Sequence, residues 1–183
     1  EGMGGKLVLH FAEDSTGHLL IIDSPKEEFT FKLVKNKIII LEENTDTFPI
    51  LRLTYDTLIL NIGKPLLPQT TYRFVHYQEP EEKFTKLEVD SFLRGHKFLT
   101  KTPYLGTADT VYFKADGSHI WKNKIDTWKL SEFNDYIFLI ISSSLHGTSY
   151  SRVTNITASE IDLLVYEEFD DYYYKLNLLR VQK

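Results

Sequence analysis

Short runs of β-branched and aromatic residues recur along the chain, with a turn signal between each run and the next. Their spacing of roughly 8–12 residues is typical of β-sandwiches and β-barrels. No apolar helical period persists, although a charged stretch, residues 79–92, could hold a short helix or a linker. We therefore predict an all-β protein, an antiparallel up-and-down meander. The expected strands are residues 6–11, 18–22, 28–34, 37–41, 50–53, 57–62, 71–77, 110–114, 119–124, 127–132, 136–142, 150–155, 160–166 and 172–181.

The composition supports this fold class and excludes several kinds of function. Aromatic residues make up 14% of the chain, which favours sheet because such side chains suit a pleated, half-buried surface. A formal net charge of −5 argues against nucleic-acid binding, which depends on Lys and Arg neutralising phosphates. The chain has no cysteine, so disulfides, thiolate metal sites and cysteine nucleophiles are excluded. No run approaches the ~20 apolar residues of a membrane span.

The two halves of the sequence match each other in order. Residues 11–14 correspond to residues 113–116, and a glycine follows each segment, Gly17 or Gly117. Further matching pairs are residues 31–33 and 128–130, 53–54 and 156–157, 58–60 and 161–163, and 72–74 and 174–176. We interpret the matches as a tandem duplication, with domains at residues 1–82 and 90–183. The alternative is that any two β-meanders share such patterns.

The second half resembles a small lipocalin-like domain of the kind common in exported proteins of Bacteroidota. The resemblance covers residues 93–181 and is carried by Leu93-Arg94-Gly95 and by residues 111–117, 127–130, 136–141, 156–163 and 174–180. The first half looks like a degenerate copy that lacks the opening strand. His96-Lys97-Phe98 stands where the family has a tryptophan.

The resemblance implies a meander that closes on itself, with room inside for side chains or one small ligand. Each half shows about seven strand signals, so we expect two barrels or half-barrels in tandem. The resemblance also implies export to the periplasm or the cell surface. The first residues have no charged and apolar regions typical of a signal peptide, so none is predicted in this chain.

Both tryptophans of the chain lie in one hairpin, which we expect to turn at Asp116-Gly117. Period-two geometry places His119 and Trp121 on one face of a strand, and Val111 and Phe113 on one face of the strand before it. The candidate cavity residues are Phe11, Phe31, Phe113, His119, Trp121, Trp128 and Tyr174. The alternative is that both tryptophans fill the barrel core.

No catalytic or metal-binding constellation is recognisable. The six histidines form none of the local spacings of zinc sites, and the carboxylates cluster in turns and at strand ends. Residues 142–147 contain three serines and a histidine without the strand-to-helix elbow of a serine hydrolase. His18 and His119 follow the two matched turns, either at barrel mouths or as exposed strand-end residues. We therefore expect neither an enzyme nor a cofactor.

Two functions remain. The first is a non-catalytic binding protein that holds a small apolar or amphipathic molecule in an aromatic-lined barrel. The second is a structural or interaction module at the cell surface, with barrels filled by side chains, that contacts a protein or a glycan. The presence or absence of a cavity would distinguish these two functions.

Overall fold

The computed structural model describes residues 7–21, 27–41, 46–54, 57–61, 71–75, 83–101, 108–133, 136–144, 147–167 and 172–181. The chain forms two compact units, Glu1–Gln78 and Glu79–Lys183. Both units are antiparallel β-meanders, which confirms the predicted fold class. The first unit is an open sheet and the second is a closed barrel.

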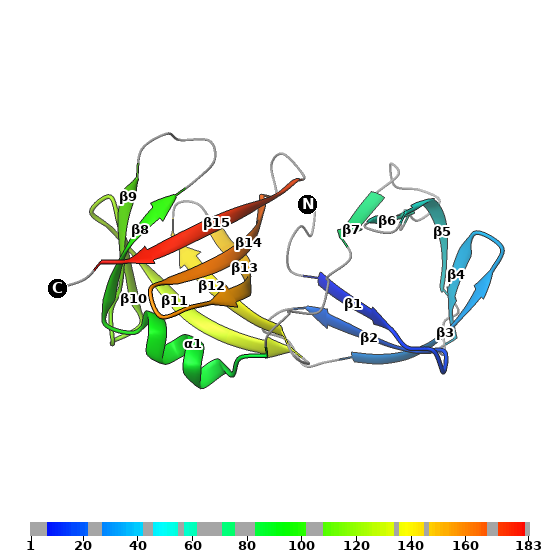
Figure 1. Cartoon of the computed structure of the whole chain (residues 1–183). Helices are drawn as coiled ribbons and strands as arrows, with labels where there is room; N and C mark the ends of the chain where they lie inside the picture. The colour runs from blue at the N-terminus through cyan, green and yellow to red at the C-terminus, as the bar shows by residue number, and fades with distance from the viewer. Residues whose placement is uncertain are drawn as a thin grey trace. The chain divides into compact units, whose positions relative to one another are not determined.

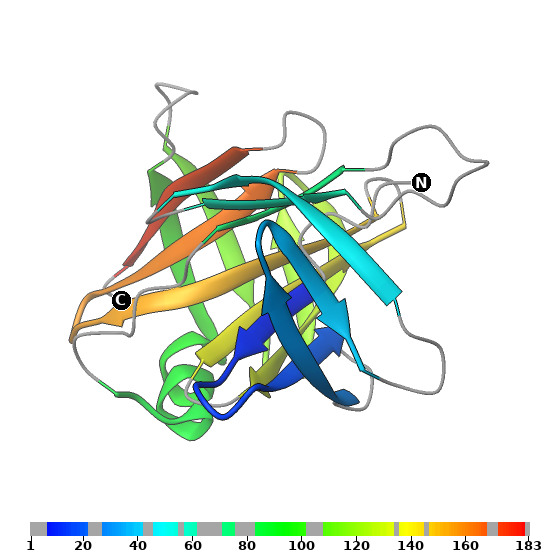
Figure 2. The ribbon, with the colours of Figure 1, turned by 90° about the vertical axis from the view of Figure 1, so that its right-hand side faces the viewer.

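The first unit is a seven-stranded sheet in which each strand pairs with the next. Its strands are β1 (Leu7–Phe11), β2 (Thr16–Ile21), β3 (Glu27–Val34), β4 (Lys37–Ile40), β5 (Asp46–Leu53), β6 (Thr57–Asn61) and β7 (Thr71–Val75). The sheet curls strongly, from β1 and β2 through β4 to β6 and β7 (Figures 1 and 2). Among the described strands, β1 and β7 are left as the two edges of this curled sheet.

The second unit is a helix followed by eight strands that close into a barrel. Its elements are α1 (Lys86–Leu93), β8 (His96–Lys101), β9 (Asp109–Phe113), β10 (Ser118–Trp121), β11 (Lys124–Phe133), β12 (Tyr136–Ser143), β13 (Gly147–Ile156), β14 (Glu160–Glu167) and β15 (Tyr172–Arg180). The last strand, β15, pairs antiparallel with β8, the first, from Asn177 opposite Lys101 to Arg180 opposite Phe98. This pairing closes the barrel and leaves it without an edge strand.

Helix α1 covers one end of the barrel, and we call this end the base. The helix begins with a capping box, in which the Thr85 hydroxyl accepts from the Glu88 N–H and the Glu88 carboxylate accepts from the Thr85 N–H. Its apolar residues Val89, Phe92 and Leu93 are buried in the barrel core. The charged stretch therefore contains the short helix that its sequence allowed. No helix in the described part of the chain is long and apolar enough to cross a membrane.

The core of the second unit is built from inward-facing residues of its strands and from the apolar face of α1. Its buried members are Val89, Phe92, Leu93, Phe98, Val111, Phe113, Trp128, Leu130, Ile137, Leu139, Val153, Ile161, Leu163, Val165 and Leu178. Burying one such large side chain contributes about 1.5–3 kcal/mol. Burial alternates along β9, whereas β12 and β13 each bury three or four consecutive residues, so both faces of these two strands are covered.

The turns around the two tryptophans differ from the prediction. Residues 114–117 separate β9 from β10, and Gly117 adopts a left-handed conformation with φ of 85°. This loop is therefore longer than the two-residue turn expected at Asp116-Gly117. The two-residue turn lies instead between β10 and β11, at Lys122-Asn123, where φ is 48° and 64°. Positive φ at both central residues is typical of a type I′ hairpin, which matches the twist of the strands.

The two matched glycines are required for different reasons. Gly117 needs its left-handed backbone, in which a side chain is strained. Gly17 has ordinary φ, but a Cβ added to it would clash with the ring of Phe29. The sequence match between these glycines therefore reflects turn geometry in one unit and close aromatic packing in the other.

Candidate ligand-binding site

The predicted cavity residues of the second unit all face the barrel interior. Phe113, His119 and Trp128 are buried, with 1%, 4% and 6% of their surface exposed. Trp121 and Tyr174 are partly buried and pack against the core. Trp121 ends β10 and Tyr174 lies near the start of β15, so both lie toward the barrel end away from α1, which we call the mouth.

Phe11 and Phe31 lie in the first unit. Their rings are 4.9 Å apart, and Phe29 contacts both in edge-to-face geometry. Both phenylalanines are only partly buried. They form an aromatic cluster of the open sheet, and their assignment to a ligand cavity remains a prediction.

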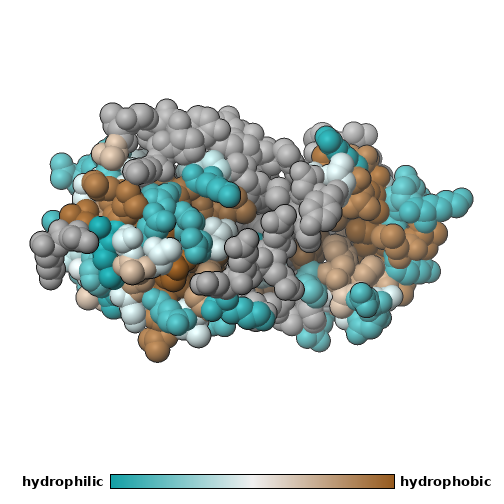
Figure 3. Space-filling model, viewed as in Figure 1, coloured by the Kyte–Doolittle hydropathy of each residue, from teal (hydrophilic) through white to brown (hydrophobic). Residues whose placement is uncertain are grey.

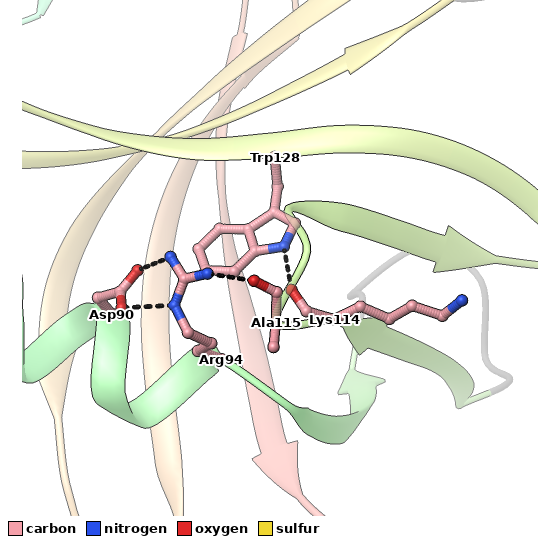
Figure 4. A network of polar contacts seen from close by, with 5 residues as sticks. All are labelled: Asp90, Arg94, Lys114, Ala115 and Trp128. Atoms are coloured by element: carbon pink, nitrogen blue, oxygen red, sulfur yellow. Dashed lines mark hydrogen bonds and ion pairs between the residues drawn. The ribbon is translucent and has the colours of Figure 1, made fainter.

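Trp128 closes the base of the barrel together with α1 (Figure 4). Its Nε1 donates to the Lys114 carbonyl at 3.2 Å, and the Arg94 guanidinium lies 5.2 Å from its ring centroid. Arg94 also donates twice to the Asp90 carboxylate, at 2.6 and 2.7 Å, and once to the Ala115 carbonyl. The hydrogen bonds from Arg94 lower the pKa of Asp90. Trp128 is thus a buried member of the core at the base, and its assignment to a ligand cavity stays a prediction.

The base of the barrel is filled by aromatic side chains. The ring centroid of Phe113 lies 5.8 Å from that of Phe98, 5.4 Å from that of Trp128 and 5.0 Å from that of His119. Phe98 in turn packs 5.4 Å from Phe92 of the helix. Such contacts have the distances and tilts of favourable aromatic pairs. No ligand atom would fit among these rings without displacing them.

Sequence analysis missed a second polar group at the base, formed by Arg180 and His96. The Arg180 guanidinium donates to the Phe92 carbonyl at 2.7 Å, lies 3.3 Å from His96 Nδ1 and is 4.4 Å from the Phe92 ring centroid. Arg180 therefore joins β15 to helix α1 and to β8. The only signal was a basic residue at the end of the closing strand, and the pairing of β15 with β8 was needed to interpret it.

His119 faces Asp126 across β10 and β11, a pairing that the sequence also did not reveal. The two residues are directly opposite in the register, and His119 Nδ1 lies 3.8 Å from the Asp126 carboxylate. Burial lowers the pKa of His119, and the Asp126 carboxylate opposes this shift. His119 is therefore neutral near pH 7, and it is not the exposed strand-end residue of the alternative. The side chain of His18 lies outside the described residues.

We predict that acid destabilises the second unit through His119. Because the folded pKa of His119 lies below its unfolded value, the unfolded chain binds more protons as the pH falls below about 6.5. Stability should therefore decrease with acid, with a contribution of up to about 1.4 kcal/mol per pH unit. The measurement is urea unfolding at pH 5–8, followed by tryptophan fluorescence, which reports this unit because both tryptophans lie in it.

The matched control for this titration is His119→Gln, which keeps a polar side chain and does not titrate. The free energy of unfolding of the wild type, relative to that of this variant, should decrease from pH 7 to pH 5, because the two proteins differ only at residue 119. A wild-type protein that became more stable in acid, relative to the variant, would mean that attraction to Asp126 outweighs burial.

Trp121 carries the second polar atom of interest. Its Nε1 is buried, like Nδ1 of His119, and neither atom has a hydrogen-bond partner in the described part of the chain. Both residues lie on the same inward-facing row of β10, because Trp121 pairs with Val111 and His119 with Phe113. At the rim beside them, Lys122 lies 5.0 Å from the Trp121 ring and forms an ion pair with Asp109 at 3.1 Å. Trp121 therefore gives the mouth an aromatic face and a buried donor without a partner in the described residues, whereas His119 lies deeper, beside Phe113 and opposite Asp126.

Among the described residues, no group of His, Asp and Glu side chains could hold a metal ion. The sequence matches no protein-family model and no curated protein.

Proposed function

We propose that this chain is a non-catalytic, lipocalin-like binding protein whose closed barrel holds one small amphipathic molecule at its mouth. The observation that carries the proposal is the buried Nε1 of Trp121 near the mouth, which has no hydrogen-bond partner in the described part of the chain. An unsatisfied buried donor costs about 1–3 kcal/mol, so such groups normally have a partner. A hydroxyl, carbonyl or carboxylate oxygen of a ligand would accept from the Trp121 N–H and remove this cost. Export to the periplasm or cell surface belongs to the same proposal and rests on the resemblance.

The filled base limits the size and orientation of the ligand. The apolar part of the ligand would contact the faces of Trp121 and Tyr174, which are partly buried. It would stop above Phe113 and Trp128, whose rings occupy the base. The Lys122 ammonium at the rim favours a ligand with an acidic or strongly polar head group, although its ion pair with Asp109 moderates this preference. A short amphiphile fits these constraints better than a large planar cofactor.

We predict that Trp121→Phe weakens the binding of an amphipathic probe. The substitution keeps an aromatic face but removes the Nε1 donor and part of the ring area, so it should cost at least about 1–1.5 kcal/mol, or roughly five- to tenfold in Kd. The probe is 8-anilino-1-naphthalenesulfonate, a compact fluorescent amphiphile with an acidic head group, titrated into the full chain. Native mass spectrometry of the freshly purified protein, compared with its denatured mass, would also reveal any ligand that it already carries.

The control is Trp128→Phe, the same substitution at the other tryptophan. This variant loses the hydrogen bond to the Lys114 carbonyl at the base but should bind the probe like the wild type, once corrected for the folded fraction. Equal weakening by the two substitutions would show that the Trp121 donor has no specific role. A wild-type protein that binds no probe and carries no ligand would exclude the carrier function.

A second candidate function is an interaction module that contacts a protein or a glycan. It is favoured by the dense packing of the barrel core, where Phe98, Leu139 and Leu163 have 0–2% of their surface exposed. A barrel filled in this way to its mouth would serve as a rigid scaffold. The mass measurement above distinguishes the two functions, because a scaffold would show the bare mass before and after incubation with the probe.

A further inference from the structure

One end of the first unit gathers exposed aliphatic and basic side chains. We call it the basic end and define it as residues 32–37, the tip of the β3–β4 hairpin, and residues 49–53 of β5. The two segments lie side by side, because the Asn36 carbonyl accepts from the Ile50 N–H at 2.8 Å. Hydrophobic and hydrophilic surfaces adjoin on this part of the first unit (Figure 3). Neither segment contains an acidic residue.

Four aliphatic side chains of the basic end are exposed to solvent: Leu33, Val34, Leu51 and Leu53. Leu33 and Leu53 keep 60% and 65% of their surface exposed. Leu51 lies outside the strand ladder, because the pairing of β5 with β6 shifts at this position and leaves it as the extra residue of a β-bulge. Apolar side chains that gather at one place on a surface, with charged residues around them, mark an interaction site.

Four exposed basic residues belong to the same end: Lys32, Lys35, Lys37 and Arg52. In the described part of the chain, their side chains form no ion pair or hydrogen bond. Glu28 and Asp46, acidic residues of the same strands, lie at the opposite ends of β3 and β5. The basic end is therefore locally cationic on a chain whose formal net charge is −5. Acidic residues elsewhere oppose this local charge weakly, because physiological salt screens exposed charges beyond about 8 Å.

The second unit shows that the meander does not require this composition. Counted from β9, its strands β13 and β14 hold the places that β5 and β6 hold in the first unit, and their pairing shifts in the same way, at Thr154. The Thr154 hydroxyl donates to the Asp162 carbonyl, and the Asn155 amide donates to the Asp162 carboxylate. The first unit has Leu51 and Arg52 at the positions of Thr154 and Asn155. Polar residues satisfied within the barrel are thus replaced by an exposed aliphatic residue and an exposed cation.

We infer that the basic end docks this chain on an anionic lipid surface. The four exposed aliphatic side chains enter the boundary between head groups and acyl chains, and the lysines and the arginine contact the anionic head groups. A basic residue near an anionic membrane strengthens binding by about fivefold, so four of them together supply a large part of the affinity. The inference is independent of any ligand in the second unit.

A lipid surface fits the basic end better than an acidic polypeptide does. Leu33 and Val34 are neighbours on β3, so their side chains point to opposite faces of the hairpin. A membrane surrounds both faces of a hairpin tip that enters it, whereas an extended polypeptide covers one face and leaves the other aliphatic side chain in water. The charge of the basic end is complementary to both partners, and the exposed aliphatic residues decide between them.

The first test is sedimentation of the full chain with phosphatidylcholine vesicles that contain about 30% phosphatidylglycerol, compared with vesicles of phosphatidylcholine alone. We expect binding to the anionic vesicles only. The double variant Lys35→Gln, Lys37→Gln should weaken this binding about 25-fold, or fivefold for each charge. The matched control is Lys86→Gln, Lys175→Gln, which removes two exposed lysines of the second unit and should bind like the wild type. Equal weakening by both double variants would show that only net charge matters and would overturn the site.

The second test measures insertion directly. Because the chain has no cysteine, Leu53→Cys can be labelled at one site with a nitrobenzoxadiazole fluorophore, whose emission shifts to shorter wavelength when it leaves water. We expect this shift on the anionic vesicles, and none for Leu87→Cys, which labels the equally exposed Leu87 of α1.

Three results would overturn the inference. They are no binding of the wild type to the anionic vesicles, vesicle binding without a shift at residue 53, and tighter binding to polyglutamate than to the vesicles. The last result would identify an acidic polypeptide as the partner instead. None of these results affects the ligand test on the second unit.

Discussion

Replacing Phe113 with alanine should lower the unfolding free energy of the second unit by about 3–5 kcal/mol. Phe113 is 1% exposed and lies between Phe98, His119 and Trp128 at the base of the barrel. The loss combines the transfer free energy of the ring with the cost of a cavity, and the rings around it belong to three other strands. The measurement is equilibrium unfolding in urea followed by the fluorescence of the two tryptophans, both of which lie in this unit.

The control for Phe113→Ala is Tyr112→Ala on the same strand. Tyr112 points to the opposite face, is partly buried, and its ring lies 5.6 Å from the Lys97 ammonium. Its removal should cost about 1 kcal/mol or less, because no core cavity forms. Similar losses for the two variants would show that β9 does not present Phe113 to a packed interior.

Most of the fold could be predicted from the alternation of apolar and polar residues along the strands. Residues 109–113 and 118–121 alternate between buried and more exposed positions, so the inward direction of Val111, Phe113 and His119 followed from period-two geometry. The same reasoning predicted an antiparallel meander, because turn signals separated every pair of strands. Alternation and turn signals depend only on residues that are close in the sequence, so both can be recognised from a single sequence.

Strand β8 was missed because its alternation is weak. Its inward-facing residues are His96, Phe98 and Thr100, and one of its outward-facing residues is Leu99, so polar and apolar residues do not separate by face. The closure of the barrel depends on this strand. The turn at Lys122-Asn123 was missed for a similar reason, since it lacks the glycine that usually marks two residues of positive φ.

Reasoning from one strand at a time predicted only part of the candidate site. His119 and Trp121 could be placed on one interior row from their own strand. Asp126 could not be paired with His119, because the register of β10 against β11 depends on the unrecognised turn at residues 122 and 123. Arg180 and His96 are 84 residues apart in the sequence, and only barrel closure brings them together. Polar residues that face each other across strands could therefore be identified only from the structure.

The two ends of the barrel differ in their packing and in their polar groups. The base is packed with rings and joined to α1 by Arg94 and Arg180, each of which donates to a backbone carbonyl across elements. Near the mouth, the buried Nε1 of Trp121 has no partner in the described residues, and at the base the same holds for Nε of Arg180. Such atoms reduce stability, and proteins tolerate them mainly where they have a role. A stable base would allow the mouth to keep polar atoms that a ligand can use.

Replacing Trp128 with alanine should also destabilise the second unit by about 3–5 kcal/mol. The substitution removes a buried ring from the core, the hydrogen bond to the Lys114 carbonyl and the surface on which the Arg94 guanidinium lies. Trp121 remains as the fluorescent reporter of unfolding. Trp128→Phe keeps most of the ring and should lose only about 1–2 kcal/mol, from the missing donor and a smaller buried area.

A double-mutant cycle of Trp128→Ala with Arg94→Met isolates the contribution of the guanidinium. Arg94 is 43% exposed, so its pair with Asp90 is screened by water and contributes little. Its position over the Trp128 ring should give a coupling energy of about 0.5–1 kcal/mol. A coupling near zero would mean that Arg94 only joins α1 to the Ala115 carbonyl. A loss below about 1 kcal/mol for Trp128→Ala itself would mean that the base is not the closed, packed end on which the binding proposal depends.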